Sequence, residues 1–327
     1  MKTRSLYLIG AAVTLMSILY ACKKDNNSSN NGTSSADLQT QSDDQTQVTN
    51  ENDAVVDDVN AVLSSQSGVT GASITPGYQH GVAAQGGGSV ESPICDATVT
   101  LDTTSSTRVL TITYNGSNCG ITRTRTGVVV VTWPAGHEWR DKGAVITVSF
   151  QNLKITRIRD GKSITLNGTH TYTNVNGGSL LDLALGKISS VTHTITSDDM
   201  SITFDNGAKR TWHVARQRVY TVVNQGLLIT QTGTHADGNT TGISEWGDNR
   251  WGNSFENVIT TPLTVDQNCN WRLTGGVIET IRPEVTTTLT FGLDSGGNPT
   301  GCPGDGLYYF KLVWEGAGKT YTFILPY

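Results

Sequence analysis

Residues 245 to 251 combine the side chains of this sequence that are best suited to chemistry. Glu245 and Asp248 lie beside Trp246 and Trp251 around a predicted turn. Aromatic rings next to carboxylates are typical of sugar-binding sites, and a glycosidase needs two carboxylates roughly 5 to 9.5 Å apart. A hairpin whose tryptophans pair across its strands explains the same residues without a ligand, and we favour it. We therefore treat these four residues as a candidate ligand surface, and we predict no catalytic residue and no deep acidic cleft.

Four histidines are the next candidates, because they fall on successive predicted strands. His170, His193, His213 and His235 could meet around a metal ion only if their strands place them on one face. A shift of one residue in strand register turns a side chain to the opposite face, so ordinary core or surface positions are the favoured interpretation. The sequence also lacks a GxSxG motif and a phosphate-binding loop. We predict no metal and no cofactor.

The first 21 residues have the pattern of a secretory signal peptide. Lys2 and Arg4 precede an apolar run of about sixteen residues, which is short of the roughly twenty that a membrane-spanning helix needs. The run ends in Leu19-Tyr-Ala-Cys22, which resembles the lipobox of bacterial lipoproteins. This resemblance implies cleavage before Cys22 and attachment of acyl chains, such as palmitate, to its thiol. Two or more acyl chains give nearly permanent anchoring, so we expect a lipid-anchored protein of the cell envelope.

The segment after the cysteine is predicted to be a disordered tether over residues 22–50, because it contains almost no large apolar side chain. Lys23 stands where the inner-membrane retention signal of enteric lipoproteins has aspartate, so we expect the outer membrane, with the leaflet left open. Removal of residues 1–21 takes away two basic residues and no acid, which changes the formal net charge from −5 to −7. Nucleic-acid binding depends on clustered basic residues, and we predict none.

Four cysteines in the rest of the chain predict two disulfides, because the number is even and the signal directs the chain out of the reducing cytoplasm. Cys95, Cys119, Cys269 and Cys302 show no CxxC or CxxH spacing, which zinc sites usually have. Three pairings are open. We favour Cys95 with Cys119 and Cys269 with Cys302, because each pair flanks a predicted hairpin that would bring its ends together.

A short amphipathic helix is predicted near the start of residues 51–93. Between Glu51 and Ser65, the apolar residues fall at helical spacing on one stripe: Val55, Val56, Val59, Val62 and Leu63. The stripe could pack on the rest of the chain or bind a partner, and we favour packing. The remainder of this region, from residue 66, is rich in Gly and Ser and is predicted to be a linker.

Residues 94–327 are predicted to form a single antiparallel β domain. Short runs rich in Val, Ile, Thr and Tyr alternate with a period of two, as at 109–114, 128–133, 144–150, 164–172, 191–196, 289–293 and 308–314. Asp160-Gly161, Asn206-Gly207 and Asp237-Gly238 are typical of tight hairpin turns. The fold class is therefore all-β, a large antiparallel sheet meander or sandwich built from consecutive hairpins. Residues 179–185 break the alternation, so a short helical connection or a domain boundary is left open there.

The order of these features resembles a family of uncharacterised envelope lipoproteins of Bacteroidetes-type bacteria. The resemblance is carried by Cys95 with Thr98-Val-Thr100, Asn118-Cys119, Arg125-Thr-Gly-Val-Val-Val-Val-Thr132, Gly168-Thr-His-Thr-Tyr-Thr-Asn174, Ile259-Thr-Thr-Pro-Leu263, Cys269-Asn-Trp271, Thr274-Gly-Gly-Val-Ile278, Cys302 and Gly318-Lys-Thr-Tyr-Thr-Phe323. It implies an envelope location, four paired cysteines and an all-β body, and it carries no activity. One departure is that Pro303-Gly304 follows the last cysteine, where the family usually has an acidic residue.

These observations lead to two hypotheses for function. The first is a lipid-anchored envelope protein that is structural or ligand-binding and meets a glycan or another envelope protein. The alternative is a glycan-acting enzyme with an acid pair near Trp246 and Trp251. An acidic cleft at the two tryptophans would favour the enzyme, whereas flat sheet faces covered with threonine would favour a scaffold or an adhesion role.

Overall fold

The computed structural model describes residues 35–65, 89–90, 94–116, 123–269, 271–283, 285–302, 306–316 and 318–327. The chain divides into two compact units, Met1–Ser42 and Asp43–Tyr327. The predicted signal peptide, Cys22 and the first part of the predicted tether lie outside the described residues, as does most of the predicted linker. The account below concerns the second unit unless it says otherwise.

Most of the described elements are strands, as the alternation of apolar and polar residues predicts. The helices are α1 (Ser35–Ser65), α3 (Leu180–Ala184) and the short 3-10 helix η1 (Gln267–Cys269). The strands are β1 (Ser89–Val90), β2 (Ala97–Asp102), β3 (Thr107–Asn115), β4 (Arg123–Pro134), β5 (Ala144–Arg157), β6 (Ser163–Asn174), β7 (Val191–Phe204), β8 (Lys209–Val223), β9 (Gly226–Gly233), β10 (His235–Asp237), β11 (Thr240–Asp248), β12 (Ser254–Asp266), β13 (Arg272–Arg282), β14 (Val285–Leu293), β15 (Tyr309–Gly316) and β16 (Lys319–Pro326).

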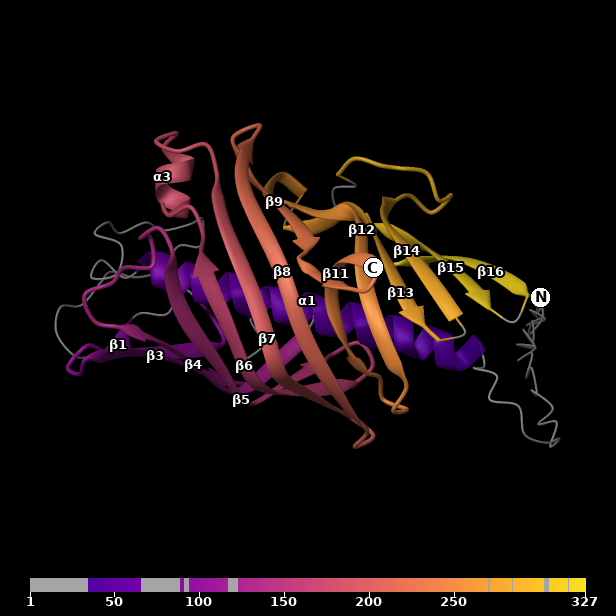
Figure 1. The fold of residues 1–327 in the computed structure, drawn as a ribbon, viewed down its shortest axis with the longest axis horizontal. Helices are drawn as coiled ribbons and strands as arrows, with labels where there is room; N and C mark the ends of the chain where they lie inside the picture. The colour runs from indigo at the N-terminus through magenta and orange to yellow at the C-terminus, as the bar shows by residue number, and fades with distance from the viewer. Residues whose placement is uncertain are drawn as a thin grey trace, which may run out of the picture. The chain divides into compact units, whose positions relative to one another are not determined.

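The strands form one antiparallel sheet in which most neighbours in sequence are neighbours in space (Figure 1). The order runs from β1 to β8, continues with β11 and ends at β16, while β9 bridges β8 and β12 and β10 pairs with β11. The predicted turns at Asp160-Gly161, Asn206-Gly207 and Asp237-Gly238 all join paired strands, and each glycine has a positive φ. The all-β meander predicted from the alternation is confirmed.

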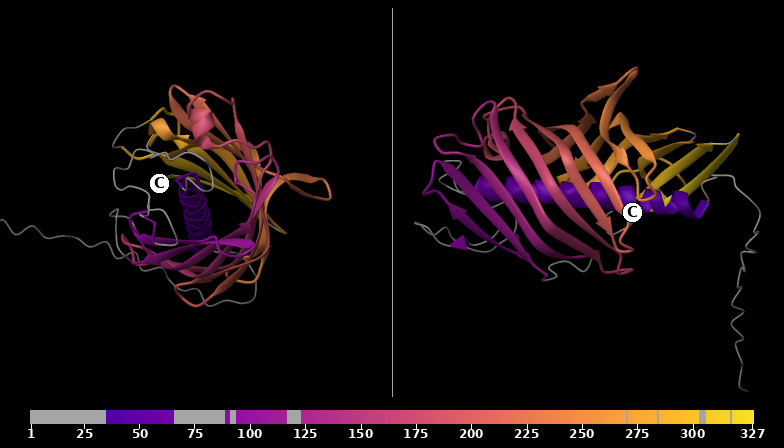
Figure 2. Two further views of the ribbon diagram at one scale, coloured as in Figure 1. Left: turned by 90° about the vertical axis from the view of Figure 1, so that its left-hand side faces the viewer. Right: turned by 60° about the horizontal axis from the view of Figure 1, so that its bottom comes forward.

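A line of bulges interrupts the strand pairing of β4 to β8. The register shifts beside Gly127 on β4 and again beside Gly168 on β6. Both glycines have a φ of +119°, and a Cβ on either would meet the backbone of the neighbouring strand, at Asn152 and Asp199. Bulges and glycines at such points increase local twist and bend a sheet. The sheet is curved in Figure 2, and we attribute part of this curvature to the bulge line.

Helix α1 is longer than the stripe of apolar residues predicted. It begins at Ser35, so residues 35–50 are helical and not part of a disordered tether. From Asp43 on, α1 runs along the concave side of the sheet (Figure 2), and its acidic side chains meet arginines of several strands. These partners offset the desolvation of a polar segment that could not bury itself by apolar contacts alone. Within the described residues, no helix combines the length and apolar character needed to cross a membrane.

The apolar face of α1 completes the main hydrophobic core. Val55, Val59 and Val62 are fully buried in one cluster with inward-facing side chains of β2 to β8. The predicted packing of the apolar stripe against the rest of the chain is therefore confirmed. Alternate residues of the strands face this core, as in the buried and exposed alternation of β2.

Residues 179–185, for which a helical connection and a domain boundary were both possible, form a helical connection. Ser179 is the N-cap of α3, and its Oγ accepts a hydrogen bond from the backbone N–H of Asp182 at 3.1 Å. The flanking strands β6 and β7 pair directly with each other. The sheet thus continues across this point.

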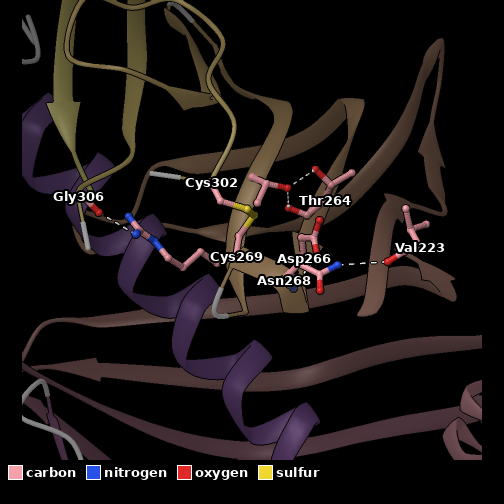
Figure 3. The surroundings of a disulfide bond; sticks show 9 residues. Val223, Thr264, Asp266, Asn268, Cys269, Cys302 and Gly306 are labelled. Carbon is pink, nitrogen blue, oxygen red and sulfur yellow. Dashed lines mark hydrogen bonds between the residues drawn. A yellow bond between two sulfur atoms is a disulfide. The ribbon is translucent and has the colours of Figure 1, made fainter. Parts of the chain in front are cut away.

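One predicted disulfide joins η1 to the segment before β15 (Figure 3). Cys269 and Cys302 are bonded with their Cα atoms 5.1 Å apart, and they flank the β13–β14 hairpin as predicted. Beside them, the Asn268 amide donates to the carbonyl of Val223 at 3.2 Å. Cys95 is also disulfide-bonded, while Cys119, its predicted partner, lies outside the described residues.

Candidate functional site

Two residues of the candidate ligand surface, Glu245 and Trp246, lie on opposite faces of strand β11. Glu245 lies opposite Val214 of β8, and Trp246 lies opposite His213. Neighbouring residues of a strand point to opposite faces of the sheet. Glu245 consequently faces α1, whereas Trp246 faces away from it, and the structure does not bring the two together in one site.

Trp246 forms an aromatic stack on the face of the sheet opposite α1. Its ring lies 4.0 Å from that of His235 and 5.4 Å from that of His213, centroid to centroid, and both pairs are nearly parallel. Trp251, in the following turn, is 43% exposed. Trp246 therefore pairs with imidazoles and Trp251 lies beside the guanidinium of Arg250, 5.9 Å from its ring centroid, so the two tryptophans do not pair with each other as the hairpin interpretation predicts.

Asp248 is exposed at the end of β11, where it is hydrogen-bonded to β8. Its backbone N–H donates to the hydroxyl of Thr211 at 3.0 Å, and that hydroxyl lies 3.3 Å from the Asp248 carboxylate. This carboxylate and that of Glu245 do not face a common cleft, because one is exposed and the other is buried beneath α1.

Glu245 is the centre of a buried polar cluster. Its side chain is 1% exposed and forms ion pairs with Arg216 and, at 3.8 Å, with Arg210. The carboxylate also accepts hydrogen bonds from Gln45 of α1 and, at 2.7 Å, from Asn257 of β12. Two guanidinium groups and two amides thus surround this buried carboxylate, and its contacts are with protein side chains.

The Glu245 cluster belongs to a larger set of contacts that we call the α1 ion-pair network. The carboxylates of α1 pair with basic residues of the sheet as follows: Asp43 with Arg157 and Lys162, Asp44 with Arg250, Glu51 with Arg123, Asp53 with Arg216 and Arg218, Asp57 with Arg218, and Asp58 with Arg125. The basic partners come from β4, β5 and the β5–β6 turn on one side and from β8 and the β11–β12 turn on the other. The sheet thus holds α1 from both sides.

Burial and charge compete within this network. Burial raises the pKa of the Asp58 carboxyl, even though Arg125 and the Tyr114 hydroxyl stabilise its charged form. Burial also acts to lower the pKa of Arg218, but the carboxylates of Asp53 and Asp57 outweigh it and hold that pKa above its ordinary value. Each charge in the network therefore depends on its partners across the helix–sheet interface.

The four candidate histidines lie in different surroundings and do not form a metal site. His170 is fully buried against Phe150 and Trp212, and His193 is buried against Trp139 and Tyr220. His213 and His235 lie on the other face, against Trp246. In the described part of the chain, no three His, Cys, Asp or Glu side chains are placed to hold a metal ion.

The arginine side of the α1 ion-pair network was not predicted from the sequence. Arg210, Arg216 and Arg218 occupy alternate positions of β8, on the face that also carries Trp212 and Tyr220. Arginines on the buried face of a strand need countercharges, and a row of acids on a helix that contains an apolar stripe could have supplied them. That pairing signal was available in the sequence, although the partners are more than 100 residues apart.

A scan against protein-family models, a search of curated proteins and a search of solved structures each gave no match to this chain.

Proposed function

We propose that this chain is a lipid-anchored protein of the bacterial cell envelope, structural or ligand-binding, held on the outer membrane by acyl chains on Cys22. The signal-like first 21 residues and the lipobox-like end at Cys22 support the anchoring. The order of cysteines and strand motifs supports membership of the Bacteroidetes-type lipoprotein family. The all-β body with a disulfide is in keeping with an envelope protein.

The binding or scaffold role is supported by the difference between the two faces of the sheet. The concave face is filled by α1, which leaves the opposite face of β4 to β7 for a partner. A row of threonines crosses that face, because Thr132 pairs with Thr147, Thr147 with Thr171, and Thr171 with Thr196. All four are at least partly exposed. Hydroxyl and methyl groups in a row suit a polar partner such as a glycan or another envelope protein.

The anchoring is tested by replacing Cys22 with alanine in the producing cell. We expect Cys22→Ala to abolish palmitate labelling and to remove the protein from the outer-membrane fraction of a density gradient, because the acyl acceptor is gone. Asn26→Ala, four residues on, is the matched control and should keep both properties. A Cys22→Ala chain that still fractionates with the outer membrane would contradict the proposal.

The binding role is tested on the threonine row. In full-length chain purified in mild detergent, Thr147→Lys with Thr171→Lys should reduce co-sedimentation with insoluble envelope glycan by about tenfold, since two long charged side chains interrupt the row of threonines. Thr103→Lys, in the exposed β2–β3 turn, is the control. Unchanged sedimentation of the double variant with an unchanged thermal midpoint would count against a glycan contact on this face.

A further inference from the structure

The concave-side face of β13 to β15, which lie side by side in Figure 1, carries buried hydrogen-bond donors without acceptors. Arg282 is 9% exposed, and its Nε and Nη2 atoms have no hydrogen-bond partner. Trp314 is 6% exposed, and its indole Nε1 has none either. Buried polar groups in folded proteins are nearly always paired, so these donors need an explanation.

Arg282 differs from the other arginines that are buried in the described part of the chain. Arg125, Arg210, Arg216 and Arg218 each lie within 4 Å of a carboxylate. Around Arg282, burial lowers the pKa of the guanidinium and no carboxylate opposes that effect. Among the described residues, no carboxylate is therefore placed as a partner for this side chain.

The strand register places the donors on one face. Thr280 of β13 pairs with Thr287 of β14, which pairs with Trp314 of β15, and all three are buried. Arg282 follows Thr280 by two residues and so points to the same side. From strand spacing and rise, the Cα atoms of Arg282 and Trp314 lie roughly 12 Å apart, a span that a long guanidinium and an indole can close around one ligand group. Trp314 is also packed against Tyr321 of β16, with ring centroids 5.2 Å apart.

The unpaired atoms specify the chemistry of the missing partner. Nε and Nη2 form one edge of the guanidinium, and their N–H groups are parallel. This edge matches two oxygens of a carboxylate or a phosphate in a bidentate contact. The indole of Trp314 adds a third donor and contributes no acceptor. The N–H groups of the charged Arg282 guanidinium and of the Trp314 indole are all donors, so together they favour an anion with several oxygens.

We propose that the inner face of β13 to β15 binds a carboxylate or phosphate group, with the Nε and Nη2 edge of Arg282 as the primary contact and the Trp314 N–H as a second. This inference deepens the ligand-binding part of the proposed function and names the class of ligand. It is independent of the threonine row, which lies on the opposite face of other strands.

Calorimetric titration of the full-length chain in mild detergent tests the site with three probes. Inorganic phosphate represents a free anion, glycerol 3-phosphate represents a lipid headgroup, and glucuronate represents an acidic glycan. We expect saturable binding of at least one probe, and the strongest probe identifies the source of the group. Binding of none of the three overturns the proposal.

Two substitutions at Arg282 distinguish the contribution of the Nε and Nη2 edge from that of the positive charge. Arg282→Lys keeps the charge but loses the bidentate edge, and Arg282→Met loses both, so we expect at least a tenfold weaker binding in each. Trp314→Phe should weaken binding about threefold to tenfold, and unchanged binding would remove Trp314 from the site. Arg159→Met, at an exposed arginine, is the control and should bind normally.

The outcomes also distinguish this site from the proposed function as a whole. Arg282→Lys should leave outer-membrane fractionation as in the unaltered chain. If probe binding is the same in the unaltered chain, Arg282→Lys and Arg282→Met, the anion site is overturned while the anchoring and the threonine row stand. A thermal midpoint that rises with phosphate only when Arg282 is present supports the site in a second measurement.

Discussion

Replacing Arg216 with methionine is expected to lower the free energy of unfolding by about 3 to 5 kcal/mol. Arg216 is 1% exposed and pairs with Glu245 of β11 and with Asp53 of α1. Methionine fills a similar volume but leaves the Glu245 carboxylate buried with only the more distant Arg210 as a countercharge. Urea unfolding of the full-length chain, followed by tryptophan fluorescence, measures the change.

Two further variants show whether the loss comes from the unpaired charge. Arg159→Met removes an exposed arginine that lies 3.4 Å from Asp43, and it should change the unfolding free energy by no more than about 0.5 kcal/mol. Adding Glu245→Gln to Arg216→Met removes the stranded charge and should recover part of the lost stability. A loss below about 1 kcal/mol for Arg216→Met would show that the α1 ion-pair network contributes little.

The sheet was predictable because each strand carries its own signal. Alternation located the runs at 109–114 and 164–172 inside β3 and β6, and Gly after Asp or Asn located three turns. These are local properties of neighbouring residues. The bulge line was less visible, although isolated glycines such as Gly127 and Gly168 inside strand patterns are its sequence signal.

The start of α1 was not predictable from local composition. Residues 43–50 are polar apart from Val48, and such a segment gains too little from apolar burial to order itself. Its ordering partners lie far away in the chain: Asp44 pairs with Arg250, and Gln45 contacts Arg210 and Glu245. Only the curved sheet brings these groups together, so a reading of the first fifty residues alone makes the segment a tether.

The residues of the candidate ligand surface do not lie together in one site, and the sequence could have predicted this separation. Glu245 and Trp246 are adjacent on a strand, and adjacent strand residues face opposite sides. Predicting which of the two is buried required the arginines of β8, since an acid on the inner face is stable only with countercharges. The site at Arg282 had no such signal, because it depends on which buried donors remain unpaired after folding.

The contribution of His170 and His193 to stability should fall when the pH is lowered from 7 to 5, because both buried side chains resist protonation. Burial, with the positive charge of Arg216 nearby, lowers the pKa of His170 to about 3. Burial, with Arg218 nearby, lowers that of His193 to about 3 as well. In the unfolded chain both titrate near 6.5. At these two positions the unfolded chain thus binds more protons between about pH 6.5 and 3, so their contribution to the unfolding free energy decreases as the pH falls through this window.

The expected loss from this effect is about 2 kcal/mol for each histidine between pH 7 and 5. His170→Phe should remove its share of the pH dependence, because phenylalanine fills the aromatic surroundings and does not titrate. Tyr172→Phe is the matched control: its ring lies 5.9 Å from that of His170, and burial keeps the tyrosine neutral in this range by raising its pKa. Equal slopes of unfolding free energy against pH in the unaltered chain and in His170→Phe would refute the prediction, whereas a shallower slope in His170→Phe alone would assign the titration to the aromatic core.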